Sequence, residues 1–159
     1  MTTKSDFTDE EWARLLQAPL VAGIAISLAD PGGPIELAKE SVASLKSATN
    51  PPSREHLLTD IALDLQSMAQ QRQNPLADFK PTQGSDPRQQ ILEELRSVSE
   101  IVSSKATAEE AAAFKRWLLT SAQAAADAAK EGGFLGFGAE QVSQGEKDML
   151  SQVSAAIGA

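Results

Sequence analysis

The fold is decided by the stretch Ala18-Pro19-Leu20-Val21-Ala22-Gly23-Ile24-Ala25-Ile26-Ser27-Leu28-Ala29. No charged side chain interrupts these 12 residues, so a helix built from them is apolar on nearly every side. A membrane span needs about 20 such residues, which favours burial inside a protein instead. We therefore predict that a first helix over 8–29 lies at the centre of a bundle. A kink or a break is expected near Pro19, because proline removes an amide donor and clashes with the preceding turn.

The composition of the whole chain points to the same fold class. Of 159 residues 42% are hydrophobic, and this fraction includes 26 alanines and 17 leucines but no cysteine or tyrosine. Alanine and leucine favour helices, whereas strands are rich in β-branched and aromatic residues. A chain of this length is typical of one domain. The composition thus excludes a disulfide scaffold, a cysteine-ligated metal site and a β-rich sandwich.

Helix-start and helix-stop signals divide the chain into elements. Capping boxes are indicated at 8–11, 107–110 and 143–146, and further starts at Ser53 and at Asp86-Pro87. Proline and glycine clusters mark the stops. The predicted helices cover 8–29, 35–48, 53–73, 87–104, 107–131 and 143–157. We predict an all-α, single-domain bundle of five to six helices over 1–159, with the segment 74–86 as the one candidate hinge.

Apolar residues repeat at three- and four-residue steps in the third and fourth helices, which predicts one buried stripe on each. The two stripes are Leu57, Leu58, Ile61, Leu65 and Met68, and Ile91, Leu92, Leu95, Val98 and Val102.

The charge of the chain argues against two classes of partner. The sequence has 14 basic and 22 acidic residues, a net charge of −8, and no window rich in Lys and Arg. Nucleic acids and anionic lipid surfaces both select clustered positive charge, so neither is an expected partner. The N-terminal residues lack a signal-peptide pattern and no run is long enough to span a membrane, so we expect a cytoplasmic protein.

One helix carries a candidate metal site. His56, Asp60 and Asp64 are spaced four residues apart and would lie along one side of the third helix. An imidazole and two carboxylates can bind a divalent cation. The alternative is a solvated flank with a His–Asp pair, which the position of the three residues beside the apolar stripe favours. We expect no cofactor.

Catalytic chemistry has few candidates in this sequence. There is a single histidine, and neither a Gly-x-Ser-x-Gly elbow nor a phosphate-binding glycine loop occurs. Adjacent acids stand at 10–11, 93–94 and 109–110, but two of these pairs fall in the first turn of a helix, where negative charge is stabilised. We therefore assign no catalytic residue and expect that the protein is not an enzyme.

The most unusual segment is Gly132-Gly133-Phe134-Leu135-Gly136-Phe137-Gly138. Phe134, Leu135 and Phe137 would either fold under as a plug that holds the last helix or form a docking surface, since exposed apolar residues that cluster mark interaction sites. Trp12, one turn into the first helix, is expected in the core or, alternatively, as an interface anchor.

Both ends of the sequence resemble a group of small bacterial helical proteins that have no assigned function. The first similar stretch is Phe7-Thr8-Asp9-Glu10-Glu11-Trp12 with the apolar run that ends in Ala29-Asp30-Pro31-Gly32-Gly33. The second is Phe114-Lys115-Arg116-Trp117-Leu118, followed by Lys130 through Gly138 and then by Val142-Ser143 and Glu146. This resemblance implies a bacterial cytosolic origin and no particular activity. We expect a non-enzymatic interaction, structural or adaptor protein with its contact surface around 134–137, which binds a protein partner or self-associates. The alternative is a helical protein that binds a small ligand or a metal.

Overall fold

The computed structural model describes residues 2–29, 45–51, 54–76, 86–130 and 144–158, and within them every regular element is a helix. After a short 3₁₀ helix, Lys4–Asp6, the helices with described bounds are α1 (Asp9–Ala29), α3 (His56–Gln70), α4 (Pro87–Lys105), α5 (Ala108–Lys130) and α6 (Gln144–Ile157). Residues 45–48 are also helical and fall within the range 35–48 predicted as a helix, of which 35–44 lie outside the described residues. The prediction of an all-α bundle is confirmed.

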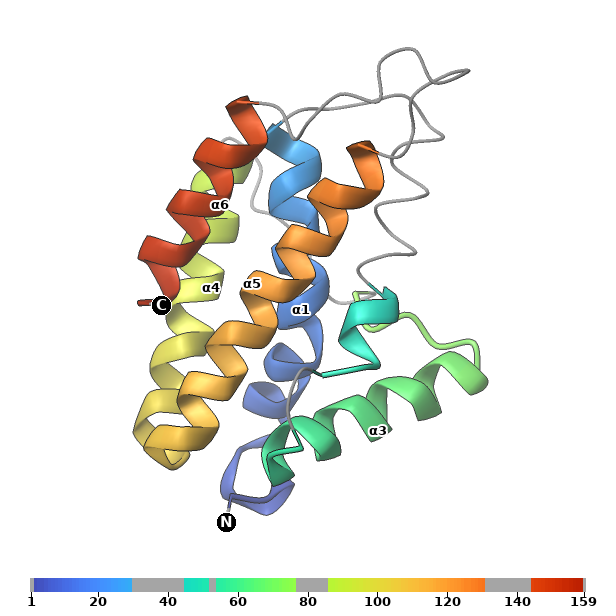
Figure 1. The fold of residues 1–159 in the computed structure, drawn as a ribbon. Coiled ribbons are helices and arrows are strands. Elements are labelled where there is room, and N and C mark those ends of the chain that lie inside the picture. The colour runs from blue at the N-terminus through green and yellow to red at the C-terminus, as the bar shows by residue number, and fades with distance from the viewer. Residues whose placement is uncertain (1, 30–44, 52–53, 77–85, 131–143, 159) are drawn as a thin grey trace.

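The helix α1 is the centre of the bundle (Figure 1). It packs against α3, α4, α5 and α6, and Leu15, Val21 and Ile26 are fully buried. The helix continues through Pro19 as one element, so the sequence-based alternative of a break at this residue is wrong. By length and composition α1 could cross a membrane, but 67% of its most apolar window is buried against the other helices.

The two predicted apolar stripes are confirmed as the core faces of α3 and α4. Only Met68 among their members is partly exposed. The buried members are Leu57, Leu58, Ile61, Leu65, Ile91, Leu92, Leu95, Val98 and Val102.

The starts of three helices follow their sequence signals. At α1 the Thr8 hydroxyl accepts from the Glu11 amide at 3.1 Å, and the Glu11 carboxylate accepts from the Thr8 amide at 2.9 Å. At α4 the Asp86 carboxylate accepts from the Arg88 amide at 3.0 Å. At α5 the Thr107 hydroxyl accepts from the Glu110 amide at 3.1 Å. The predicted caps at Ser53 and Ser143 lie outside the described residues, and α3 begins at His56 instead of 53.

The helices on both sides of the candidate hinge belong to one bundle. The helix α3 runs at a steep angle to the other helices, on the side of the bundle away from α4 and α6, and packs on α1 and α5 (Figure 1). The stretch that follows α3 is tied to α1, because Gln17 Nε2 donates to the Pro75 carbonyl at 3.1 Å. Residues 77–85 of the predicted hinge lie outside the described residues.

Candidate functional site

The three residues of the candidate metal site do not converge on one point. His56 Nδ1 lies 3.4 Å from Asp60 Oδ2 and 3.2 Å from the Thr2 carbonyl. Asp64 instead accepts from Trp12 Nε1 at 2.8 Å and from Lys4 Nζ at 3.2 Å. In the described part of the chain no group of three or more His, Asp or Glu residues could hold a metal ion. These side chains tie α3 to the N-terminal segment.

Trp12 lies in the core, the first of the two roles expected for it, and not at the surface as an interface anchor. Only 4% of Trp12 is exposed, and its ring packs against Phe7 with centroids 5.8 Å apart. The indole nitrogen reaches Asp64 and is the one polar edge of an otherwise apolar side chain. Trp12 therefore joins the N-terminal segment, α1 and α3.

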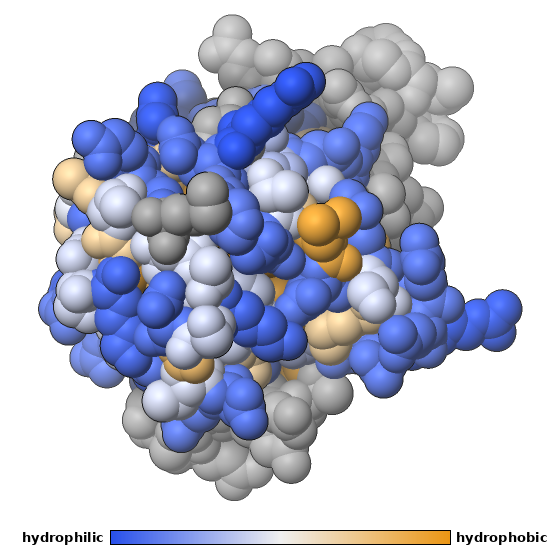
Figure 2. All heavy atoms as spheres, turned by 90° about the horizontal axis from the view of Figure 1, so that it is seen from below, coloured by the Kyte–Doolittle hydropathy of each residue, from blue (hydrophilic) through white to orange (hydrophobic). Residues whose placement is uncertain are grey.

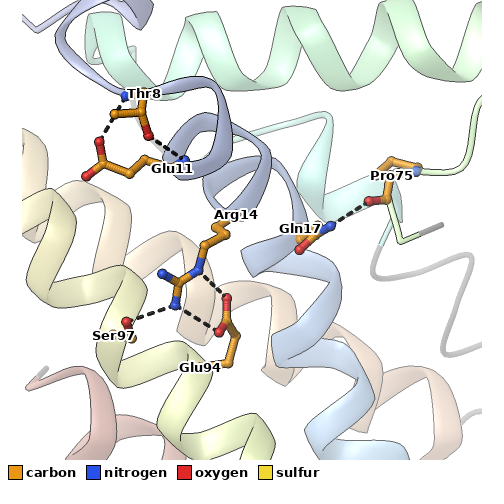
Figure 3. A network of polar contacts seen from close by, with 7 residues as sticks. All are labelled: Thr8, Glu11, Arg14, Gln17, Pro75, Glu94 and Ser97. Atoms are coloured by element: carbon orange, nitrogen blue, oxygen red, sulfur yellow. Dashed lines mark hydrogen bonds and ion pairs between the residues drawn. The ribbon is translucent and has the colours of Figure 1, made fainter. Parts of the chain in front are cut away.

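The acidic pairs also serve structural contacts (Figure 3). Besides capping α1, Glu11 forms an ion pair with Lys105, and this ammonium and the Thr8 amide lower the pKa of Glu11. Glu94 accepts two hydrogen bonds from Arg14, both at 2.9 Å, which raise the pKa of the guanidinium. These ion pairs join α1 to α4.

Glu110 completes only half of its capping box, because its carboxylate reaches a different partner. Oε1 of this buried residue accepts from the Thr2 amide at 3.1 Å, across 108 residues of sequence. Oε2 is buried and has no hydrogen-bond partner among the described residues. The residue anchors the N-terminal segment to α5.

The predicted docking residues Phe134, Leu135 and Phe137 lie outside the described residues. The choice between a plug and a docking surface therefore stays a prediction.

An open groove lies where α4, α5 and the end of α6 meet. Its volume is ≈ 570 Å³, in the range of about 300–1,000 Å³ that small-ligand sites occupy. We call it the α4–α5–α6 groove. Its lining residues are Ser103, Ala108, Ala111, Ala112, Lys115, Arg116, Leu119 and Gly158.

The lengths of the helices explain why this groove exists. The helix α6 ends at Ile157, part of the way along α4 and α5, and both of these helices continue beyond it (Figure 1). The six lining residues from α5 recur at steps of three and one, so they form a single stripe along that helix. Alanine side chains leave this stripe shallow. The groove is the part of the α5 flank that α6 does not cover.

Lys115 and Arg116 are the charged residues in the described lining of the groove. Lys115 is half-buried and Arg116 is exposed. A Cβ atom placed on Gly158, which has a φ of +72°, would lie 3.7 Å from Lys115 Nζ, so the ammonium sits at the end of α6. The lining contains no Asp or Glu among the described residues. The groove can therefore hold an anion beside an apolar wall.

Sequence reasoning missed this groove, although a signal for it was present. The spacing of 108, 111, 112, 115, 116 and 119 marks one flank of α5, next to the apolar face that carries Trp117. The missing information was the position of the end of α6.

The rest of the surface offers little apolar area in the described residues. Leu45 and Leu63 are the exposed large hydrophobic residues there, at 38% and 56%. Seen from below, the molecule is mainly hydrophilic, and its hydrophobic side chains form small separate areas (Figure 2).

No family model, no curated protein and no solved structure matches the chain. The resemblance of its two ends to a bacterial group stays a prediction.

Proposed function

We propose that this protein is a non-enzymatic binding protein of the bacterial cytosol that uses the α4–α5–α6 groove as a contact surface. The observation that carries the proposal is a groove of ≈ 570 Å³ with an apolar floor and two cations. Pockets with apolar walls and a few converging polar groups are the usual form of ligand sites.

The proposal that the protein is not an enzyme is supported by the structural contacts that its titratable side chains make. His56, Glu94 and Glu110 each hold a contact between distant segments of the bundle. Within the described residues the groove lining offers Ser103 and Lys115 but no carboxylate or imidazole to act as a general base.

A second contact surface, for a protein partner or for self-association, is proposed at Phe134 and Phe137 from the sequence pattern alone. The seven consecutive residues 132–138 consist of four glycines and three large apolar residues, a composition that favours such a role. The two surfaces can be tested separately, because different variants should abolish binding at each of them.

Affinity capture from a native lysate of the source organism tests the proposal. Wild-type protein, Ala112→Trp and a Phe134→Ser/Phe137→Ser variant are compared, and both proteins and extracted small molecules are identified by mass spectrometry. Ala112 is exposed in the groove, so tryptophan should fill the groove without disturbing the core. Ala155→Trp, an exposed position of α6 outside the lining, is the matched control.

We expect a molecule that wild-type protein and Ala155→Trp retain and that Ala112→Trp loses. A protein partner lost only from the Phe134/Phe137 variant would assign the second surface. The proposal for the groove fails if Ala112→Trp retains every molecule that wild-type protein retains, or if wild-type protein retains none.

A further inference from the structure

We infer that the α4–α5–α6 groove binds a small amphiphile with one anionic head group and an apolar body, such as a medium-chain carboxylate. The inference rests on the proposed function and names the chemical class of the ligand.

The charge of the groove is opposite to that of the chain. The protein has a net charge of −8, yet the described lining has two basic residues and no acidic residue. Elsewhere, Lys4, Arg14 and Lys105 pair with carboxylates of other segments of the bundle. No ion pair joins Lys115 or Arg116 to any residue that the structure describes. As far as the described residues go, these two cations are therefore available to an external anion, and charge-assisted hydrogen bonds to them would be stronger than neutral ones.

The two cations lie in one part of the groove and the alanines in another, so the head group and the apolar body of a ligand can bind in different places. Lys115 Nζ lies at the end of α6, close to Gly158. Ala108, Ala111 and Ala112 continue from there along α5 toward the α4–α5 turn, and Leu119 lies one turn beyond Lys115 on the other side. A ligand can thus place its anion at Lys115 and Arg116 while its apolar body lies on the alanines.

The size of the groove favours a small ligand over a protein segment. Eight of the described residues line it, whereas a stable protein interface involves about 20–30 residues on each side. Lys115 is half-buried and carries a long aliphatic stem, so the stem can cover apolar atoms of the ligand while the ammonium stays at the rim.

Titration of the purified protein with charged and uncharged amphiphiles tests this inference. The probes are decanoate, decyl sulfate, decyltrimethylammonium and 1-decanol, all below their aggregation concentrations, and acetate as a head group without a tail. Calorimetry gives Kd, and amide chemical shifts of Ala111, Ala112, Leu119 and Gly158 locate the site. An acidic amphipathic helical peptide is titrated as the competing class of ligand.

We expect decanoate and decyl sulfate to bind at these amides about tenfold or more tightly than decyltrimethylammonium and 1-decanol, with no binding of acetate. Lys115→Glu/Arg116→Glu should reverse this order and favour decyltrimethylammonium. Arg96→Glu/Lys147→Glu, which makes the same charge change at exposed positions of α4 and α6 outside the lining, should keep the wild-type order. Ala112→Trp should abolish binding of every probe, and Ala155→Trp should not.

Equal affinity for all four decyl probes, shifts at other amides, or tighter binding of the acidic peptide would each overturn the inference. If no amphiphile binds but Ala112→Trp still removes a molecule captured from lysate, the ligand class is wrong and the proposed function stands. If Ala112→Trp also changes nothing in the lysate experiment, the proposed function fails as well.

Discussion

Asp64 Oδ2 accepts a hydrogen bond from Trp12 Nε1 at 2.8 Å, and this bond joins α3 to α1 across 52 residues of sequence. The indole is almost fully buried, so its N–H group needs a partner inside the protein. The same carboxylate also pairs with Lys4, a residue whose side chain is 60% exposed. Asp64 thus has a structural task that differs from the metal ligation its spacing suggested.

Removal of the Asp64 acceptor should destabilise the fold. For Asp64→Ala we expect a loss of about 1–2 kcal/mol in the free energy of unfolding, because the buried indole N–H is left without a partner. Asp64→Asn keeps an acceptor and should lose less. Lys4→Gln removes only the exposed ion pair and should change stability by under about 1 kcal/mol. Urea denaturation checks all three; equal effects of Asn and Ala would contradict the role of the hydrogen bond.

The Arg14–Glu94 pair should couple α1 to α4 measurably. Its two hydrogen bonds are 2.9 Å long, and Ser97 Oγ accepts a third at 2.8 Å. Both side chains are less than one third exposed, so a double-mutant cycle of Arg14→Met and Glu94→Gln should give a coupling of about 1–2 kcal/mol. The control is a second cycle in which Arg96→Met replaces Arg14→Met. Arg96 is exposed and lies in α4, the same helix as Glu94. A coupling near zero would show that the pair is merely a surface contact.

Stability should depend on pH through Glu11. Its pKa is lowered from 4.5 by Lys105 and by the Thr8 amide, so the folded state binds this proton less readily than the unfolded state. The resulting stabilisation is present above about pH 4.5 and is lost as the pH falls through the lower folded value. The gap in urea midpoint between wild-type protein and Glu11→Gln should therefore be largest above pH 5 and should shrink toward pH 3.

The Lys105→Gln variant tests whether Lys105 is the partner of Glu11. The gap in urea midpoint between wild-type protein and Lys105→Gln should follow the same pH trend but should be smaller. A gap between wild-type protein and Glu11→Gln that stays constant from pH 6 to pH 3 would contradict the assignment.

The end of α3 offers a stabilising substitution. Arg72 has a φ of 57°, and the Gln73 amide beside it donates to the Met68 carbonyl at 2.8 Å, which is the hydrogen bond of a helix stop that glycine prefers. The left-handed conformation costs a non-glycine residue roughly 1–2 kcal/mol, and part of this is offset by the greater freedom of glycine in the unfolded chain. Arg72→Gly should therefore gain about 0.5–1 kcal/mol and raise Tm, whereas Arg72→Ala should not. Thermal unfolding compares them; an equal Tm for the two variants argues against strain at Arg72.

The two interpretations of the glycine-rich segment differ in the response to Phe137→Ala. If Phe137 docks a partner, the variant should keep its helical circular dichroism and lose partner binding or self-association. A plug that holds α6 would instead lose stability by about 3–5 kcal/mol, the usual result of truncating a buried phenylalanine. Circular dichroism together with sedimentation velocity separates these outcomes, and a variant unchanged in both measurements would contradict both interpretations.

The local features of the fold could be predicted from the sequence, and the long-range contacts could not. Periodicity identified the buried faces of α3 and α4, because a helix places residues three and four apart on one side. Thr8 and Thr107 marked helix starts because capping depends on neighbours only three residues away. The bond between Thr2 and Glu110 depends on how whole helices are placed, and no local pattern reports this. The groove was missed for a similar reason: the spacing marks its α5 flank, but its lining also includes Ser103 of α4 and Gly158 just after α6, whose positions beside α5 no local pattern reports.

The central position of α1 has a consequence for synthesis of the chain. Its packing partners α4, α5 and α6 all follow residue 86, so the most apolar helix leaves the ribosome well before they do. At about 5–20 residues per second, the ribosome needs roughly 3–12 s to pass from Ala29 to Pro87. Throughout this interval α1 lacks most of its cover, which is the condition under which nascent chains aggregate or recruit chaperones. Ribosomes stalled before α5 should therefore carry a chaperone-bound chain, and release after α6 should free it.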